Sequence, residues 1–295
     1  MDAADLKIFA AVARTGSMNK ATAVLHTVQS NVTARIQALE AELGCKLFER
    51  NPRGAVLTPA GRRLLPFAAR AVHLFADAKR AAADDGTPSG ALVIGSLEST
   101  AAVHLAPIFA EFVAANPAVD LTLKTGTTCE LVEQVLDRQI DGAFVCGPVM
   151  HPHLLVEPFV QEELVILTGP SILRFGDLLA KPDFRIIVLR AGCSYRLRLE
   201  AMLAQRGIVG IRVCELGTLE TIFACVSAGL GVTMLPKAML GSVWPKTRVR
   251  SHPLPDGEGL VETVFIRHRE SYTASALRSF LDLSRPARGQ LGAAE

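Results

Sequence analysis

Paired cysteines are missing from this sequence. Its six cysteines are scattered singly, and no two of them form a CxxC pair. This spacing predicts reduced, mostly buried thiols in a cytoplasmic protein and argues against a disulfide framework or a zinc site. The six are Cys45, Cys129, Cys146, Cys193, Cys214 and Cys225.

Long apolar runs and an export signal are missing as well. No uncharged apolar stretch reaches the roughly 18 residues that a membrane-spanning helix needs. Asp2 and Asp5 stand where a signal peptide carries basic residues and an apolar core. We therefore expect neither secretion nor contact with a membrane.

Motifs for catalysis or cofactor binding are also lacking. The segment His151-Pro152-His153 has neither the spacing nor the acidic or cysteine partners of a metal site. The Gly-Leu-Gly at 229–231 precedes a predicted strand, whereas a dinucleotide-binding motif follows one. No nucleophile, base and orienting group are recognisable together. The sequence thus predicts a protein that is not an enzyme and needs no cofactor or metal.

What the sequence does contain is 295 residues with an uneven charge, enough chain for two or three compact units. Residues 1–90 carry 12 Lys and Arg against 8 Asp and Glu, whereas residues 91–295 carry 19 against 21. This slightly basic N-terminal part is compatible with nucleic-acid contact there, but the excess is too small to argue for it alone.

The N-terminal part has the pattern of a winged helix-turn-helix. Apolar residues at helical spacing predict helices over about 2–15, 18–25 and 29–43, with a short turn at 26–28. Residues 46–50 and 55–57 read as two short strands joined by a turn. The alternative is a purely structural three-helix module with a polar face.

Hydrogen-bonding side chains occupy the exposed start of the third helix. Such side chains reach base edges and phosphates when a helix enters the major groove of DNA. Two arginines of the strand pair are placed to grip the DNA backbone beside the groove. The candidate DNA-contacting residues are Gln29, Ser30, Asn31, Thr33 and Arg35 on the helix, and Arg50 and Arg53 on the wing.

The first sixty residues resemble LysR-type transcriptional regulators. The resemblance rests on QSNVTARIQALEAELG at 29–44, LFER at 47–50 and LTPAG at 57–61. Two positions depart from the common family pattern. Val28 stands where Ser or Thr often caps the recognition helix, which leaves Thr27 as an alternative cap, and Ser30 stands where Pro often opens that helix.

A long helix is predicted from Pro59 to about Ala83, capped by Thr58 and kinked early by Pro66. Apolar residues recur along it at the spacing of a coiled coil, and the hinge-like composition of 84–90 follows. The alternative is a helix that packs on its own domain. We favour a dimerisation helix, as the resemblance also implies, through Leu64, Ala68, Ala71, Phe75 and Ala78.

From residue 91 onward, predicted strands alternate with predicted helices, which indicates parallel sheets with helices on both faces. The predicted strands are 91–95, 120–124, 142–146, 186–189, 213–216, 232–235 and 261–266. Overall the fold class is α/β. The expected parts are a largely helical winged helix-turn-helix at 1–58, the linker helix and hinge at 59–90, and a two-lobed domain at 91–284. Lobe one would span about 91–165 plus 266–284 and lobe two about 166–265, followed by a flexible tail at 285–295. The two-lobed part resembles the periplasmic-binding-protein-like effector domain of the family.

Hydroxyl-bearing and thiol-bearing residues follow several of these strands at predicted helix starts. Free backbone N–H groups at helix N-termini suit a carboxylate or a similar anion. For each residue alone, the alternative is an ordinary helix cap. The candidate effector-binding residues are Ser99, Thr100, Thr127, Thr128, Cys193, Ser194 and Thr221.

Cys193 also suggests a thiol-based redox sensor, because a helix start can depress the pKa of a thiol. A ligand-binding module that does not bind DNA is a second alternative. The resemblance implies double-stranded promoter DNA, a small-molecule effector such as a carboxylate, and a homodimer or homotetramer. RNA polymerase is a further candidate partner.

Overall fold

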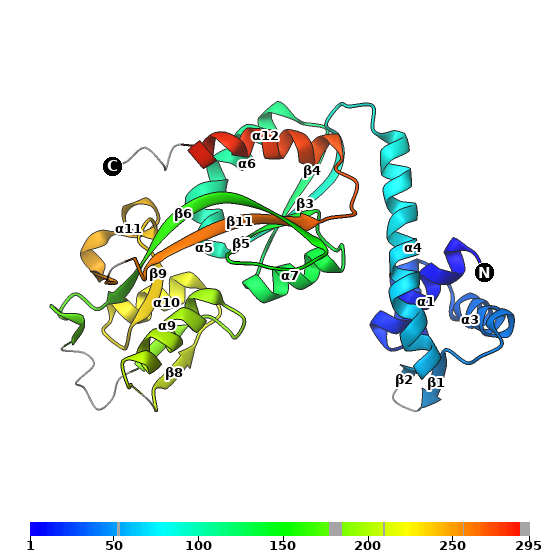
Figure 1. The fold of residues 1–295 in the computed structure, drawn as a ribbon, viewed down its shortest axis with the longest axis horizontal. Helices are drawn as coiled ribbons and strands as arrows, with labels where there is room; N and C mark the ends of the chain where they lie inside the picture. The colour runs from blue at the N-terminus through cyan, green and yellow to red at the C-terminus, as the bar shows by residue number, and fades with distance from the viewer. Residues whose placement is uncertain (52–53, 177–184, 209, 256, 290–295) are drawn as a thin grey trace. The chain divides into compact units, whose positions relative to one another are not determined.

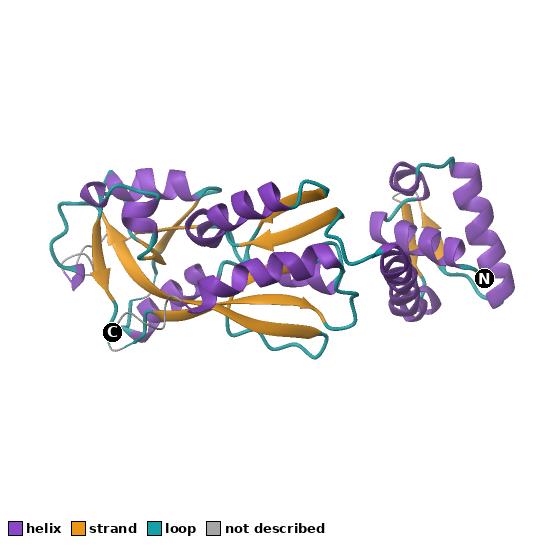
Figure 2. Cartoon of the chain, turned by 90° about the horizontal axis from the view of Figure 1, so that it is seen from above, coloured by secondary structure: helices purple, strands orange, loops and turns teal. Residues whose placement is uncertain are grey.

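The structure is a computed structural model that describes residues 1–51, 54–176, 185–208, 210–255 and 257–289. The chain divides into two compact units, Met1–Asp85 and Gly86–Glu295. Figure 1 traces both units from the N-terminus to the C-terminus, and Figure 2 shows where helices and strands lie in each.

Unit 1 is helical apart from one two-stranded hairpin (Figure 2). The hairpin is antiparallel and pairs Phe48 with Leu57 and Asn51 with Gly54. The elements are α1 (Ala3–Thr15), α2 (Met18–Leu25), α3 (Gln29–Leu43), β1 (Phe48–Asn51), β2 (Gly54–Leu57) and α4 (Pro59–Ala83). The predicted helix-turn-helix, hairpin and linker helix are therefore all present.

Local sequence explains where these helices begin and end. Asp2 caps α1 through a capping box, and Gly16 ends it in the left-handed conformation. Val28 precedes α3 without a side-chain cap, while the Thr27 hydroxyl accepts a hydrogen bond from the Asn31 side chain instead of capping the backbone. Thr58 caps α4, which is continuous through Pro66.

The core of unit 1 is formed by the apolar faces of its three short helices, closed by the hairpin and the start of α4. Phe9, Val12, Val32 and Ile36 are buried in it. Two apolar residues of these helices are less well covered: Val24 is 47% exposed and Leu43 is 39% exposed. Both lie in the last turn of their helix, where fewer neighbours cover a side chain.

Unit 2 alternates strands and helices as the sequence predicts. Its strands are β3 (Gly90–Ser96), β4 (Val119–Thr125), β5 (Gly142–Cys146), β6 (Leu154–Thr168), β7 (Arg185–Val188), β8 (Arg212–Glu215), β9 (Thr233–Pro236), β10 (Arg250–Pro253) and β11 (Leu260–His268). The helical segments are α5 (Glu98–Thr100), η1 (Ala101–Leu105), α6 (Ala106–Ala115), α7 (Thr128–Leu136), α9 (Ser194–Gln205), α10 (Leu219–Ser227), α11 (Met239–Ser242), η2 (Lys246–Arg248) and α12 (Ser275–Gly289).

The main sheet of unit 2 is mixed, which corrects the prediction of parallel sheets. It has seven strands in the order β10-β6-β11-β5-β3-β4, and β9 pairs with β6 off this path. Strand β3 runs parallel to β4 and β5, whereas β11 runs antiparallel to β5 and β6. Strands β7 and β8 form a separate parallel pair. Strand β6, which runs antiparallel to its neighbours, carries the chain from one lobe to the other.

The long strand β6 joins the two lobes. Its residues 154–163 pair with β11 in lobe one, and its residues 164–168 pair with β9 and β10 in lobe two. The sequence analysis missed β6 and β10. The expected lobe boundaries at 165 and 266 therefore fall inside strands, because β6 is shared and β11 belongs to the lobe-one sheet along its length.

Two apolar clusters fill unit 2. One packs α6 and α12 against a face of the lobe-one sheet through Phe112, Phe144, Phe265 and Phe280. The other extends from α7 in lobe one to α9 and α10 in lobe two, so the lobes share buried contacts. The lobes are thus packed onto each other beside the shared strands.

The C-terminal helix is longer than the sequence analysis expects. Helix α12 continues to Gly289, so residues 285–289 of the expected flexible tail are helical, and 290–295 lie outside the described residues. Within the described residues, no helix combines the length and the apolar character needed to cross a membrane.

Candidate functional site

The start of α3 exposes a row of short polar side chains. Gln29, Ser30 and Asn31 are exposed and Thr33 is half-buried, while Val32 and Ile36 on the opposite face are buried. The helical periodicity that buries one face leaves the other free for a partner. Gln29, Ser30 and Asn31 are therefore exposed as the sequence indicates, Thr33 is partly so, and their contact with DNA stays a prediction.

Arg35 differs from this expectation. Its guanidinium donates to Asp5 at 2.7 Å and to Asp2 at 3.1 Å. These carboxylates raise the pKa of Arg35, and the backbone N–H of Asp5 together with the Arg35 guanidinium lowers the pKa of Asp2. The charge of Arg35 is thus balanced by α1, so in this structure Arg35 ties two helices together.

Gln37 is a candidate contact that the sequence analysis missed. It is exposed and lies about two turns after Ser30, on the side of α3 that faces away from the buried Val32 and Ile36. Its amide can both donate to and accept from base edges. Its spacing of seven residues from Ser30, about two helical turns, was the signal in the sequence that places both side chains on one face of α3.

The hairpin is fixed to the helices by backbone contacts. The Ala55 N–H donates to the Gly16 carbonyl at 2.8 Å, at the junction of α1 and α2. A Cβ on Gly54 would lie 2.3 Å from that same carbonyl oxygen, and the φ of Gly54 is +134°. Only glycine fits there without strain. Arg50 lies in β1, its side chain is not among the described atoms, and Arg53 lies outside the described residues.

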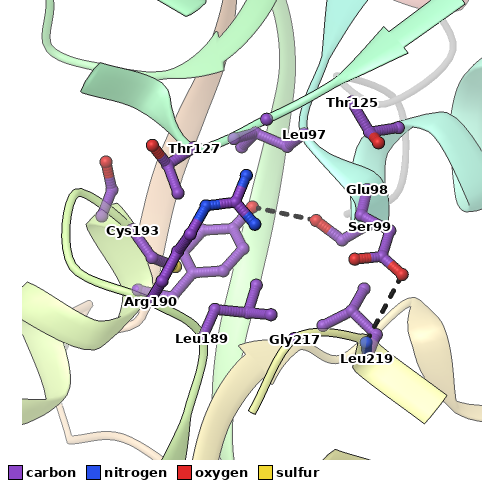
Figure 3. Close-up of a pocket in the computed structure, with 13 residues that line it drawn as sticks. Leu97, Glu98, Ser99, Thr125, Thr127, Leu189, Arg190, Cys193, Gly217 and Leu219 are labelled. Carbon is purple, nitrogen blue, oxygen red and sulfur yellow. Dashed lines mark hydrogen bonds between the residues drawn. The ribbon is translucent and has the colours of Figure 1, made fainter. Parts of the chain in front are cut away.

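A pocket lies between the two lobes of unit 2, with an empty volume of about 590 Å³ that includes some open solvent. A cleft lined by apolar side chains and a few polar ones is typical of a small-molecule site. Figure 3 shows side chains of β3–α5, α7, α9 and α10 around it. The lining residues are Leu97, Glu98, Ser99, Thr125, Gly126, Thr127, Leu189, Arg190, Cys193, Ser194, Tyr195, Gly217 and Leu219.

Four of the seven predicted effector residues line this pocket, namely Ser99, Thr127, Cys193 and Ser194. The other three do not. Thr128 lies behind Ser194, whose hydroxyl donates to the Thr128 hydroxyl at 2.9 Å. Thr100 is fully buried, and its hydroxyl has no hydrogen-bond partner among the described residues.

Thr221 is the third predicted residue outside the pocket lining. It is exposed, and its hydroxyl donates to the backbone carbonyl of Thr218 at 2.8 Å. Thr218, not Thr221, caps α10. Here the ordinary structural interpretation of a threonine near a helix start is the better one.

Polar contacts bridge the lobes around the pocket. The Arg190 guanidinium forms two hydrogen bonds with the Glu130 carboxylate, at 2.7 and 2.8 Å. This pairing lowers the pKa of Glu130 to about 2. The Tyr195 and Ser99 hydroxyls lie 3.5 Å apart, as the dashed line in Figure 3 marks. A ligand that enters here can compete for these contacts and change how the lobes meet.

Burial decides the chemistry of Cys193. The side chain is only 6% exposed, and desolvation raises the pKa of its thiol. The N–H groups at the start of α9 lower the pKa of this thiol, as expected, but their effect is the weaker one. Removing the thiolate from water costs more free energy than these N–H groups contribute. The redox interpretation is therefore not supported. Cys193 lines the pocket as a neutral thiol.

Glu98, Arg190 and Tyr195 are pocket residues that the sequence analysis did not select. Burial raises the pKa of Glu98 and raises that of Tyr195 well above its ordinary value. Perturbed ionisable groups in a cleft mark functional sites. Glu98 directly precedes Ser99, and Tyr195 directly follows Ser194, so both adjoin residues that the sequence analysis selected.

The linker helix α4 exposes only part of the predicted dimerisation row: Phe75 and Ala78 are exposed and Ala71 is half-buried. Ala68 is buried and Leu64 is partly buried in the core of unit 1, so neither is free for a partner. Phe67 is 72% exposed, Leu74 is 67% exposed and Phe75 is 53% exposed. We call these three residues the linker-helix face. It shares Phe75 with the predicted row, and it contains Phe67 and Leu74 where the prediction had Ala68 and Ala71.

These features define a class of protein: a winged helix-turn-helix joined to a two-lobed α/β domain with a pocket between its lobes. Residues 3–62 match the bacterial regulatory helix-turn-helix protein of the lysR family, and residues 85–288 match the LysR substrate binding domain. The chain belongs to the LysR family. It is a DNA-binding transcriptional regulator with an effector-binding domain.

Relatives support this assignment over nearly the whole chain. The HTH-type transcriptional regulator GltR of Bacillus subtilis is 40% identical over 276 residues, covering 94% of this chain and 93% of that protein. The HTH-type transcriptional regulator YofA of Bacillus velezensis is 42% identical over 282 residues, covering 96% and 97%. Both are regulators, which argues against an enzyme.

Solved structures share the fold. A full-length OxyR variant from Pseudomonas aeruginosa aligns with a TM-score of 0.69 at 18% identity, covering 98% of this chain and 95% of that one, a likeness that concerns the fold alone. Full-length CbnR complexed with its target DNA aligns with a TM-score of 0.61 at 26% identity, covering 97% and 100%.

Proposed function

We propose that this regulator binds promoter DNA as a homodimer in the cytoplasm and that a small carboxylate in the interlobe pocket alters this binding. The observation that carries the proposal is the combination of an exposed polar face on α3 with a polar-lined pocket between the lobes. The exposed face of α3 is available to a duplex of DNA, whereas the interlobe pocket admits only a small molecule.

The DNA contact is assigned to the start of α3 and to the hairpin. Gln29, Ser30, Asn31 and Gln37 would face the base edges, and Arg50 and Arg53 would contact phosphates. The CbnR structure, which contains target DNA, aligns with 97% of the present chain and supports this assignment. Arg35 would act indirectly, by holding α3 against α1 through Asp2 and Asp5.

The carboxylate is assigned to the hydroxyl-bearing part of the pocket. Thr127 and Ser194 line it at the starts of α7 and α9, where the helix dipoles favour an anion. Arg190 adds a positive charge, which a ligand carboxylate would share with Glu130. Binding would then alter the contacts between the lobes.

Dimerisation is assigned to the linker-helix face. Large apolar side chains this exposed cost free energy in water and gain it when a second helix covers them. A homodimer also presents two recognition helices to two half-sites, as promoter binding by a helix-turn-helix requires. A homotetramer and contact with RNA polymerase are extensions of the same proposal.

A gel-shift series with DNA flanking the gene, using the full-length chain, tests the DNA contact. Replacing Ser30 and Gln37 together by Ala should weaken specific binding by about tenfold or more, since each lost base contact costs about 1–3 kcal/mol. The matched control is Gln139→Ala, an exposed residue of unit 2. Unchanged affinity in the double variant would remove α3 from the interface.

The pocket is tested by calorimetric titration of the full-length chain with a panel of small carboxylates. Ser194→Ala removes a hydroxyl that lines the pocket, whereas Thr221→Ala removes one that does not. Weaker binding in the first variant and unchanged binding in the second are expected. Equal loss in both variants, or none in either, would remove Ser194 from the site.

A further inference from the structure

Glu98 is the one carboxylate among the residues that line the interlobe pocket. It opens α5 directly after strand β3 and is half-buried. Its carboxylate accepts a hydrogen bond from the backbone N–H of Leu219 at 3.4 Å, which Figure 3 marks with a dashed line. Within the described part of the chain, no Lys, Arg or His nitrogen lies within 4.0 Å of it.

The nearest positive charge is already engaged. Arg190 lines the same pocket and contributes a favourable electrostatic interaction to Glu98. Its guanidinium, however, donates two hydrogen bonds to the Glu130 carboxylate, at 2.7 and 2.8 Å. That bidentate pair directs the Arg190 guanidinium to Glu130, so Arg190 forms no ion pair with Glu98.

The surroundings of Glu98 make that charge costly. Leu97, Leu189 and Leu219 line the pocket beside it. Burial is the largest cause that raises the pKa of Glu98, and the like charge of the neighbouring Glu220 raises it further. A carboxylate in such surroundings gains more from a cationic partner than one exposed to water does.

From this arrangement we infer that the effector carries a cationic nitrogen that pairs with Glu98. The inference rests on the proposed function, which places a carboxylate at Thr127 and Ser194. Figure 3 shows the Thr127 side chain in a different part of the pocket from Glu98. A ligand with both groups is a small zwitterion, such as an amino acid. Leu97, Leu189 and Leu219 would contact its apolar part.

The test is calorimetric titration of the full-length chain with the twenty common amino acids. Each one that binds is compared with its deaminated acid and with its decarboxylated amine. We expect the deaminated acid to bind at least about 30-fold more weakly, because a buried charge then loses its partner. Glu98→Gln should weaken binding of the amino acid by a similar factor and should not weaken binding of the deaminated acid.

Glu98→Gln is a conservative change, since an amide oxygen can still accept the hydrogen bond from Leu219. An unchanged melting temperature would show that the variant folds. The control is Glu220→Gln, which removes a nearby charge from an exposed residue that does not line the pocket. It should change the affinity by less than about threefold, as expected for a screened surface charge.

The outcomes separate this inference from the proposed function. If deaminated acids bind as tightly as amino acids, or if Glu98→Gln leaves amino-acid binding unchanged, the pairing is overturned while a carboxylate effector stands. If amines bind as tightly as amino acids and depend on Glu98, the pairing stands and the carboxylate assignment fails. If neither amino acids nor carboxylates bind, both are overturned.

Discussion

The helix-turn-helix unit and the interlobe pocket use similar polar side chains in opposite ways. On α3, Gln29, Ser30 and Asn31 are exposed and come from three consecutive positions. In the pocket, Ser99 and Thr127 are buried and come from separate helices of one lobe, while Ser194 comes from the other lobe. The first site exists on one helix alone, whereas the second exists only when two lobes meet.

The difference also concerns charge. Arg35 and Arg190 both form ion pairs with carboxylates from another element. In unit 1 this pairing fixes the helix that presents the polar row, while in unit 2 it bridges the lobes beside a cavity. Arg35, which the sequence assigns to DNA contact, can therefore position the recognition helix instead of contacting DNA itself.

The largest expected effect comes from Gly54, whose replacement should abolish DNA binding and leave the interlobe pocket intact. Gly54→Ala places a Cβ 2.3 Å from the Gly16 carbonyl oxygen and should destabilise unit 1 by about 2–4 kcal/mol. DNA binding should fall with it, while ligand binding in the pocket persists. Thermal melting followed by both binding assays measures this.

Gly44→Ala is the control for that variant. Gly44 also has a positive φ, of +66°, but nothing lies within 4 Å of a Cβ built there. Its replacement should cost only about 1 kcal/mol, the usual penalty for a left-handed helix end. Equal melting temperatures for the two variants would contradict the close approach of the hairpin to the helices.

The next largest effect concerns the linker-helix face, on which we expect DNA binding, but not ligand binding in the pocket, to depend. Leu74→Glu should raise the dimer dissociation constant by at least about 100-fold, because it buries a charge in an apolar contact. Light scattering over a dilution series measures this. Lys79→Glu, on the same helix, should leave the dimer intact, and a dimer that survives Leu74→Glu would exclude this face.

A smaller effect, on the salt dependence of DNA binding, distinguishes an arginine that contacts phosphate from one that pairs with carboxylates of its own chain. Arg53→Ala should lower the slope of log affinity against log salt by about 1, as expected for the loss of one phosphate contact. Arg35→Ala should leave the slope unchanged, because Asp2 and Asp5 already balance that charge. Gel shifts at several salt concentrations measure both, and equal slopes for the two variants would contradict the distinction.

The smallest effect is the titration of Glu130 in the bridge between the lobes. Its pKa is depressed to about 2, so the ion pair with Arg190 is fully present above the ordinary pKa of 4.5 and is lost only as the pH falls through about 2. Arg190→Ala should return the pKa toward 4.5. Carboxyl chemical shifts in an NMR titration measure this, and an unshifted Glu130 in the parent chain would argue against the bridge.

The sequence predicted the short apolar strands of unit 2 and missed β6, the strand that joins the lobes. Strands β3, β5 and β9 are short apolar runs with turn residues at their ends, so their pattern is local. Strand β6 mixes exposed, half-buried and buried positions, because its two halves pair with different neighbours in two lobes. No single periodicity describes such a strand, so its local pattern does not predict it.

The sequence by itself determined the helix-turn-helix, its caps and the polar row on α3, because each depends on residues within a few positions of one another. Tertiary structure alone decided that Arg35 pairs with α1, that Cys193 is a buried neutral thiol, and that Glu98 shares a pocket with Ser194. These outcomes depend on which distant segments meet and on how much water they exclude. Spacing along the chain encodes neither quantity.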